Sequence, residues 1–166
     1  MCASVLTAET DVQQRLQQAE ARCREQGIRL TSIRKQVLAL LLRHEGGVKA
    51  YQLLDEMKAV HEQSTPPTVY RALEFLQDAG LVHRLDSLNA YVACHIEQPQ
   101  HQHGLLLVCP LCHAVSEIDD PDVCHLLADR IRVAGYQLQG SCLEIKALCG
   151  ACSQTPHTHC CAPHHD

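Results

Sequence analysis

The chain has 166 residues and a mass of 18.4 kDa, enough for one ordinary domain or two small ones with a buried core. Its apolar fraction of 46% excludes fibrous and wholly disordered classes, and no apolar run approaches the ~20 residues of a membrane helix. The first thirty residues carry polar and charged side chains throughout. We therefore expect no secretory signal and a cytoplasmic location.

Cysteine and histidine are unusually frequent, and they are unevenly distributed. Nine of the 11 Cys and nine of the 12 His follow Asp86. The 11 basic and 11 acidic residues up to Asp86 balance, whereas 3 basic and 8 acidic residues follow it, so the net charge of -5 belongs to the second half. In a reducing compartment this composition indicates metal sites rather than disulfides. The neutral first half can contact phosphates locally, which the acidic second half would repel.

The first half is predicted to form four amphipathic helices followed by a β-hairpin. The helices are predicted to end before Gly27, Gly46-Gly47 and Gly80. The second helix is predicted to start at Thr31 or Ser32, and the fourth at the Ser64-Thr65-Pro66-Pro67 segment. Residues 81–85 and 90–94 alternate as hairpin strands should. This order of elements is that of a winged helix-turn-helix. The predicted inward positions are Val12, Leu16, Ala19 and Cys23, then Ile33, Val37, Leu38 and Leu41, then Leu53, Leu54, Met57 and Val60, then Val69, Ala72, Leu73 and Leu76.

The second half is predicted to form a small α/β domain after a polar, His-rich linker. Strands are expected over 105–108, 114–118 and roughly 136–148, with a helix opened by Asp119-Asp120-Pro121 and closed by Gly135. That helix is expected to turn Val123, Leu127, Ile131 and Ala134 inward. A three-stranded sheet with one helix leaves apolar edges uncovered, so we expect it to dimerise. The fold class is α+β, with domains at 1–95 and 105–153, a hinge at 96–104 and a disordered tail at 154–166.

Two Cys-x-x-Cys pairs are the most specific motif, Cys109 with Cys112 and Cys149 with Cys152. Each pair lies at a predicted strand end, so four thiolates can converge in the tetrahedral arrangement of a structural zinc site. The alternative is a thioredoxin-type redox motif, which requires a helix start inside a βαβ unit. The sequence does not supply that context.

A second, more dispersed group of possible ligands lies on both sides of the linker. One thiolate with imidazole and carboxylate ligands would make a four-coordinate site, and the thiolate favours Zn²⁺ over Fe²⁺ or Mn²⁺. Taken singly, each residue of this group could instead be an ordinary surface or buried residue without a metal. The group consists of His83, Cys94, His101, His103 and Glu117.

The run from Pro66 to Leu76, Gly80-Leu81-Val82-His83, Cys94-His95 and the two Cys-x-x-Cys pairs together resemble the ferric uptake regulator superfamily, most closely its zinc uptake regulators. The resemblance covers about residues 19–152. It implies a DNA-binding winged helix joined by a hinge to a dimerisation domain. It also implies two zinc ions per chain, a structural one on the four paired cysteines and a regulatory one on His83, Cys94, Glu117 and a linker histidine. His101 and His103 are alternatives for that linker ligand.

The helix opened by Pro67 would be the recognition helix, with Tyr70 and Arg71 facing outward near its start. Arg71 is suited to guanine O6 and N7, whereas Tyr70 suits a thymine methyl or a phosphate. The alternative is that Arg71 only pairs with Glu74 or Asp78. Further candidates for DNA-backbone contact are Thr68, Tyr51 and Arg84.

The predicted function is therefore a zinc-responsive, DNA-binding homodimer that represses zinc-uptake genes when loaded with zinc. It would have no small organic substrate and no membrane partner. An iron, manganese or peroxide sensor on the same scaffold is the first alternative. A zinc-dependent or thiol enzyme is more distant, because no HExxH-like or HxE arrangement supplies a general base beside an open zinc site.

Overall fold

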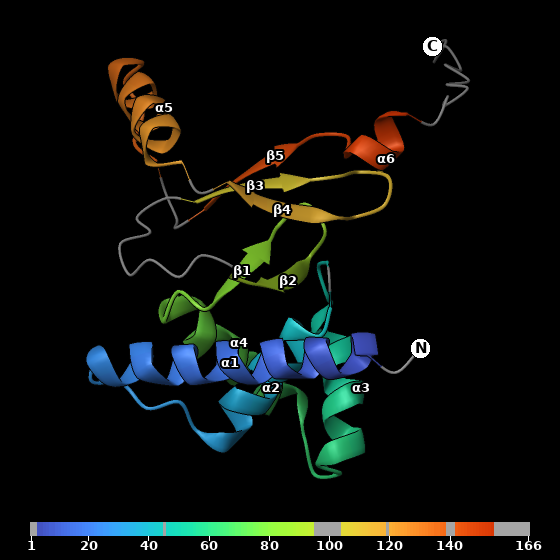
Figure 1. The fold of residues 1–166 in the computed structure, drawn as a ribbon. Coiled ribbons are helices and arrows are strands. Elements are labelled where there is room, and N and C mark those ends of the chain that lie inside the picture. Colours follow the sequence, from blue (N-terminus) through green and yellow to red (C-terminus); the bar gives the residue numbers. More distant parts are fainter. Residues whose placement is uncertain (1–2, 45, 95–103, 119, 139–141, 155–166) are drawn as a thin grey trace, which may run out of the picture.

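The computed structural model describes residues 3–44, 46–94, 104–118, 120–138 and 142–154. We call residues 3–94 the N-terminal part and residues 104–154 the C-terminal part. Figure 1 shows the hairpin lying between the helices of the N-terminal part and the sheet of the C-terminal part. Within the described residues no helix is long and apolar enough to cross a membrane. The elements are α1 (Ala3–Glu25), α2 (Ser32–Leu42), α3 (Ala50–Val60), α4 (Pro66–Asp78), β1 (Val82–Leu85), β2 (Ala90–Ala93), β3 (Gly104–Val108), β4 (Val115–Ile118), α5 (Pro121–Val133), β5 (Cys142–Lys146) and α6 (Gly150–Ser153).

The helices α1 to α4 pack around one apolar core, as predicted. All four residues of the predicted α4 stripe are buried, and so are the four inward residues of α1. Gly27 and Gly80 follow α1 and α4 with φ of +70° and +66°, a conformation that glycine adopts without a Cβ penalty. Thr65 precedes α4, but its hydroxyl pairs with the Thr68 hydroxyl at 2.9 Å instead of capping a backbone N–H.

Two predicted core positions of the helices are wrong. Ile33 is 39% exposed and Val60 is 62% exposed. Both lie in the terminal turn of a short helix, Ile33 at the start of α2 and Val60 at the end of α3. Helical spacing places them on the apolar stripe, yet both side chains are exposed at these helix ends.

The hairpin is more deeply buried than its alternating sequence indicates. All four residues of β2 are buried, whereas a half-exposed strand would alternate. Tyr91 and Ala93 pack on the helical core. Ala90 and Val92 belong to a second apolar cluster, the junction cluster, which also contains Leu85 of β1 and residues of β3 and β4. The hairpin is thus covered on both faces.

The C-terminal sheet has the order β4-β3-β5, with β4 antiparallel and β5 parallel to β3. The three predicted strands are present, but the third is shorter than predicted: β5 spans Cys142–Lys146, and residues 136–138 are not a strand. The prediction did not include α6. The predicted burial of one face of α5 is also wrong for the single chain, since no residue of α5 is buried and Val123 is 44% exposed. Figure 1 shows why, because α5 lies beyond the end of the sheet and not across its face.

Candidate metal centres

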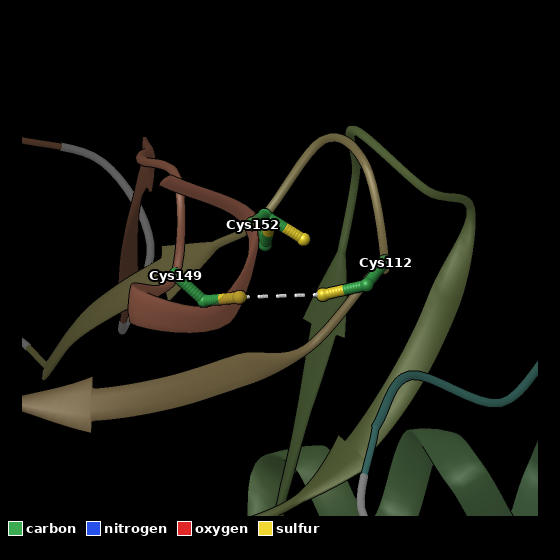
Figure 2. A group of neighbouring side chains, drawn as sticks. Cys112, Cys149 and Cys152 are labelled. Carbon is green, nitrogen blue, oxygen red and sulfur yellow. Dashed lines mark hydrogen bonds between the residues drawn. The ribbon is translucent and has the colours of Figure 1, made fainter. Parts of the chain in front are cut away.

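The four paired cysteines come together at one end of the C-terminal sheet. Cys109 and Cys112 lie in the turn between β3 and β4, while Cys149 and Cys152 flank and enter α6. Their sulfur atoms all lie within 4.8 Å of one another. Figure 2 shows the Cys149 and Cys152 side chains pointing toward Cys112, whose Sγ is 3.6 Å from the Sγ of Cys149. Tetrahedral zinc with Zn–S bonds of ~2.3 Å separates its sulfurs by about 3.8 Å, so the four side chains fit zinc.

Backbone N–H groups around this cluster favour thiolates at two of its members. Hydrogen bonds from the backbone of Cys112, Cys149 and Leu111 lower the pKa of Cys109 to about 6. A backbone hydrogen bond from Cys152 lowers the pKa of Cys149, whereas hydrogen bonds with Cys112 and Cys149 raise the pKa of Cys152 to about 12. A backbone hydrogen bond closes the turn that follows Cys109: the His113 N–H donates to the Cys109 carbonyl at 2.9 Å, and His113 has a φ of +60°.

A second group of three possible ligands joins the two parts of the molecule. His83 on β1 and Cys94 just after β2 meet Glu117 on β4, with their ligand atoms all within 4.8 Å of one another. His83 Nε2 lies 3.0 Å from Glu117 Oε1, and Cys94 Sγ donates to the same oxygen at 3.6 Å. These spacings suit bonds of about 2.0–2.3 Å from nitrogen, oxygen and sulfur to a tetrahedral zinc. We call this group the junction triad.

The junction triad is almost closed to solvent. The side chains of His83 and Glu117 are only 6% and 5% exposed. Burial by itself lowers the pKa of His83, but hydrogen bonds to Cys94 and Glu117 outweigh it and raise that pKa to about 9. An imidazole, a thiol and a carboxylate taken out of water here need one another or a cation as partners.

The backbone of Cys94 is fixed from two sides. Its N–H donates to the Leu81 carbonyl at 2.9 Å, and its own carbonyl accepts from Arg15 Nη2 of α1, also at 2.9 Å. Nothing in the spacing of the sequence pairs Arg15 with a residue 79 positions later. The predicted ligands His101 and His103 lie outside the described residues.

The residues predicted to contact DNA are accessible. Tyr70 is 50% exposed and Tyr51 59% exposed, and Arg71 is also exposed, whereas Thr68 is partly covered. Lys49 Nζ lies 6.0 Å from the centre of the Tyr51 ring. Arg84 on the hairpin pairs with the exposed Asp86 at 3.0 Å. Tyr70, Arg71 and Thr68 lie in the first two turns of α4, the part of a recognition helix that meets base edges.

One contact between the two parts had no sequence signal. The carboxylate of Glu144 on β5 accepts hydrogen bonds from the backbone N–H groups of Asp86 and Ser87 in the hairpin turn. An acidic residue in a short strand looks like an ordinary surface residue, and a backbone donor leaves no trace in the sequence.

Comparison with known proteins gives one consistent result. The model of the Ferric uptake regulator family matches residues 25–146. The Zinc uptake regulation protein of Escherichia coli (strain K12) is 40% identical over 147 residues, which are 86% of this chain and 84% of that protein. Among solved structures, a zinc uptake regulator complexed with zinc and DNA matches with a TM-score of 0.76 and 38% identity, over 86% of this chain and 95% of the other. The crystal structure of holo XcZur matches with a TM-score of 0.73 and 43% identity, over 84% and 97% of the two chains.

Proposed function

Since this chain belongs to the ferric uptake regulator family, we propose that it is a zinc-responsive, DNA-binding transcription regulator. It acts as a cytoplasmic homodimer that represses zinc-uptake genes when it is loaded with zinc. Support comes from the 40% identity to the Escherichia coli zinc uptake regulation protein and from the likeness to a regulator bound to zinc and DNA. Regulation of transcription is the whole activity, with no substrate turned over.

In this proposal, each chain binds two zinc ions. Cys109, Cys112, Cys149 and Cys152 hold the structural one, and all four positions of that site are filled by protein, as in closed structural sites. His83, Cys94 and Glu117 hold the regulatory one together with His101 or His103 from the hinge. The single observation that carries the proposal is the junction triad, because two of its ligands belong to the N-terminal part and one to the C-terminal part.

The proposed mechanism follows from where the ligands are anchored. Bound zinc would supply a bond to each part at once. His83 and Cys94 then hold the hairpin, and Glu117 holds β4, at a fixed separation across the junction. In a dimer, this fixes the two α4 helices relative to each other, as binding to successive major grooves ~34 Å apart requires. By linkage, DNA tightens zinc binding by the same factor by which zinc tightens DNA binding.

The division into domains is part of this proposal. Residues 1–95 form the winged-helix domain, 96–104 the hinge, 105–153 the dimerisation domain and 154–166 the tail. The two apolar clusters support a boundary between the parts, since the larger cluster contains only residues up to Ala93. The junction cluster supports placing the contact between the two proposed domains at the hairpin and β3, since it contains residues of both.

Zinc is proposed over iron or manganese because the junction triad contains a thiol. Fe²⁺ and Mn²⁺ are better served by imidazole and carboxylate ligands alone. In an iron, manganese or peroxide sensor, saturating Fe²⁺ or Mn²⁺ would activate DNA binding more fully than saturating Zn²⁺, although Zn²⁺ generally binds a given site more tightly. Titrating DNA binding with each metal under anaerobic conditions separates these functions.

The test is a mobility-shift titration against the promoter DNA of zinc-uptake genes. Cys94→Ser and His83→Ala should fold, retain one zinc per chain, and lose zinc-dependent DNA binding. His44→Ala is the matched control, because His44 is an exposed histidine that pairs with Glu56 outside both clusters. Zinc dependence that persists in Cys94→Ser and His83→Ala would remove the regulatory role from the junction triad.

A further inference from the structure

Glu144 connects the C-terminal sheet to the tip of the hairpin without using any residue of the metal sites. One carboxylate oxygen accepts from Asp86 N–H and the other from Ser87 N–H, the latter at 3.2 Å. Two successive backbone N–H groups at the start of a turn form a concave donor site for an anion. Glu144 fills this donor site from a strand that is 57 residues further along the chain.

The surrounding contacts place Glu144 at the edge of the same junction. Leu85, next to the hairpin turn, is fully buried in the junction cluster together with Leu106 and Val108 of β3. Glu144 is aligned with Leu106 in the β3–β5 register. The carboxylate of Asp86, the acidic side chain of this turn, pairs with Arg84 at 3.0 Å. The Glu144 carboxylate therefore adds a polar contact to an apolar one, and both join the hairpin to the sheet.

We propose that Glu144 sets the zinc concentration at which the regulator switches, by holding the hairpin turn against the sheet before metal binds. The proposal rests on the regulatory site proposed above. The arrangement that Glu144 favours is the one in which His83 and Cys94 reach Glu117. The apparent affinity of a site scales with the fraction of molecules already in the competent arrangement. Glu144 raises that fraction in the metal-free protein and is a positioning residue, not a ligand.

This role predicts a specific pattern of effects. Removing the contact lowers the apparent zinc affinity of the regulatory site, because fewer metal-free molecules hold the hairpin turn against the sheet. It leaves the zinc-saturated complex with DNA unchanged, because bound zinc then holds the junction closed. A side-chain acceptor on free backbone N–H groups typically changes an equilibrium about fivefold. A purely structural role would instead lower stability without moving the zinc midpoint.

The experiment measures the free-zinc midpoint of the regulatory site by competition with a fluorescent chelator, without DNA and with the structural site filled. Glu144→Ala should raise the midpoint about fivefold or more. Glu144→Gln should raise it less, because its amide oxygen can still accept one of the two hydrogen bonds. Glu25→Ala removes an exposed carboxylate at the end of α1 and should leave the midpoint at the wild-type value. At saturating zinc, all variants should bind operator DNA like the wild type.

A wild-type midpoint in folded Glu144→Ala would overturn the proposal. If that variant does not fold, amide hydrogen exchange in the zinc-free wild type decides the question. The Asp86 and Ser87 amides should be protected, and exchange at the rate of free peptide would overturn it as well. The proposed function fails separately, through wild-type protein that binds operator DNA equally with and without zinc.

Discussion

Leu106→Ala tests whether the apolar junction contributes to zinc sensing. Leu106 lies in β3, is 1% exposed, and belongs to the junction cluster with Leu85 and Val92 of the hairpin. Truncating a buried leucine to alanine costs about 2–5 kcal/mol, because methyl groups lose their contacts and a cavity remains. If only about 1.4 kcal/mol of this loss falls on contacts between the two parts, the closed fraction of metal-free protein drops about tenfold. The zinc midpoint of the regulatory site should then rise by the same factor.

Leu73→Ala provides the matched control for this prediction. Leu73 is equally buried, but in the helical core, where it contributes to folding of the N-terminal part. Urea unfolding of both zinc-loaded variants should show comparable losses of stability, and chelator competition should show a shifted midpoint only for Leu106→Ala. Equal midpoints in the two variants would refute the reasoning, because the junction cluster would then stabilise the fold without favouring the closed arrangement.

Three further predictions concern the metal sites. Cys112→Ser should lower the tightly bound zinc by one ion per chain, measured by atomic emission after dialysis against a mild chelator, and full retention would exclude Cys112 as a ligand. Arg15→Ala should weaken regulatory zinc binding a few-fold, since a net hydrogen bond contributes about 0.5–1.5 kcal/mol, whereas Arg24→Ala on the same helix should not. The zinc affinity of the regulatory site should rise with pH up to about pH 9. Below that pH His83, with a pKa of about 9, carries a proton that zinc must displace, so the affinity should change at least roughly tenfold per pH unit. Calorimetry in buffers of different ionisation enthalpy would detect the released proton, and a flat pH profile would contradict this prediction.

The helical core could be predicted because its burial follows a single period. The α4 stripe at i, i+3, i+4 and i+7 is buried as spacing predicts, and proline and glycine mark the ends of that helix. The convergence of the two Cys-x-x-Cys pairs could also be predicted, because each pair follows a strand closely: Cys109 and Cys112 lie in the turn after β3, and Cys149 and Cys152 lie at the start of α6 after β5. In these segments the residues that determine the structure are close together in the sequence, so the sequence pattern is enough to predict it.

The junction could not be predicted in the same way. Burial of β2 on both faces depends on a sheet that follows later in the chain, and period-2 alternation indicates only one covered face. Glu144 and Arg15 act on backbone atoms, which every residue has, so no residue pattern identifies their partners. The exposure of Val123 on α5 has a related cause, since helical spacing identifies an apolar face but not whether the same chain covers it.

A short path of backbone hydrogen bonds connects the junction triad to α4, the proposed recognition helix. The Cys94 N–H donates to the Leu81 carbonyl at 2.9 Å, and the Leu81 N–H donates to the carbonyl of Leu76, on the buried stripe of α4, at 2.8 Å. His83 follows Leu81 by only two residues. A restraint on the two hairpin ligands therefore reaches α4 through a rigid connection, and the apolar core beneath α4 resists local adjustment. Movement of the hairpin relative to the sheet should thus carry α4 with it, which is what a metal-controlled reading of DNA requires.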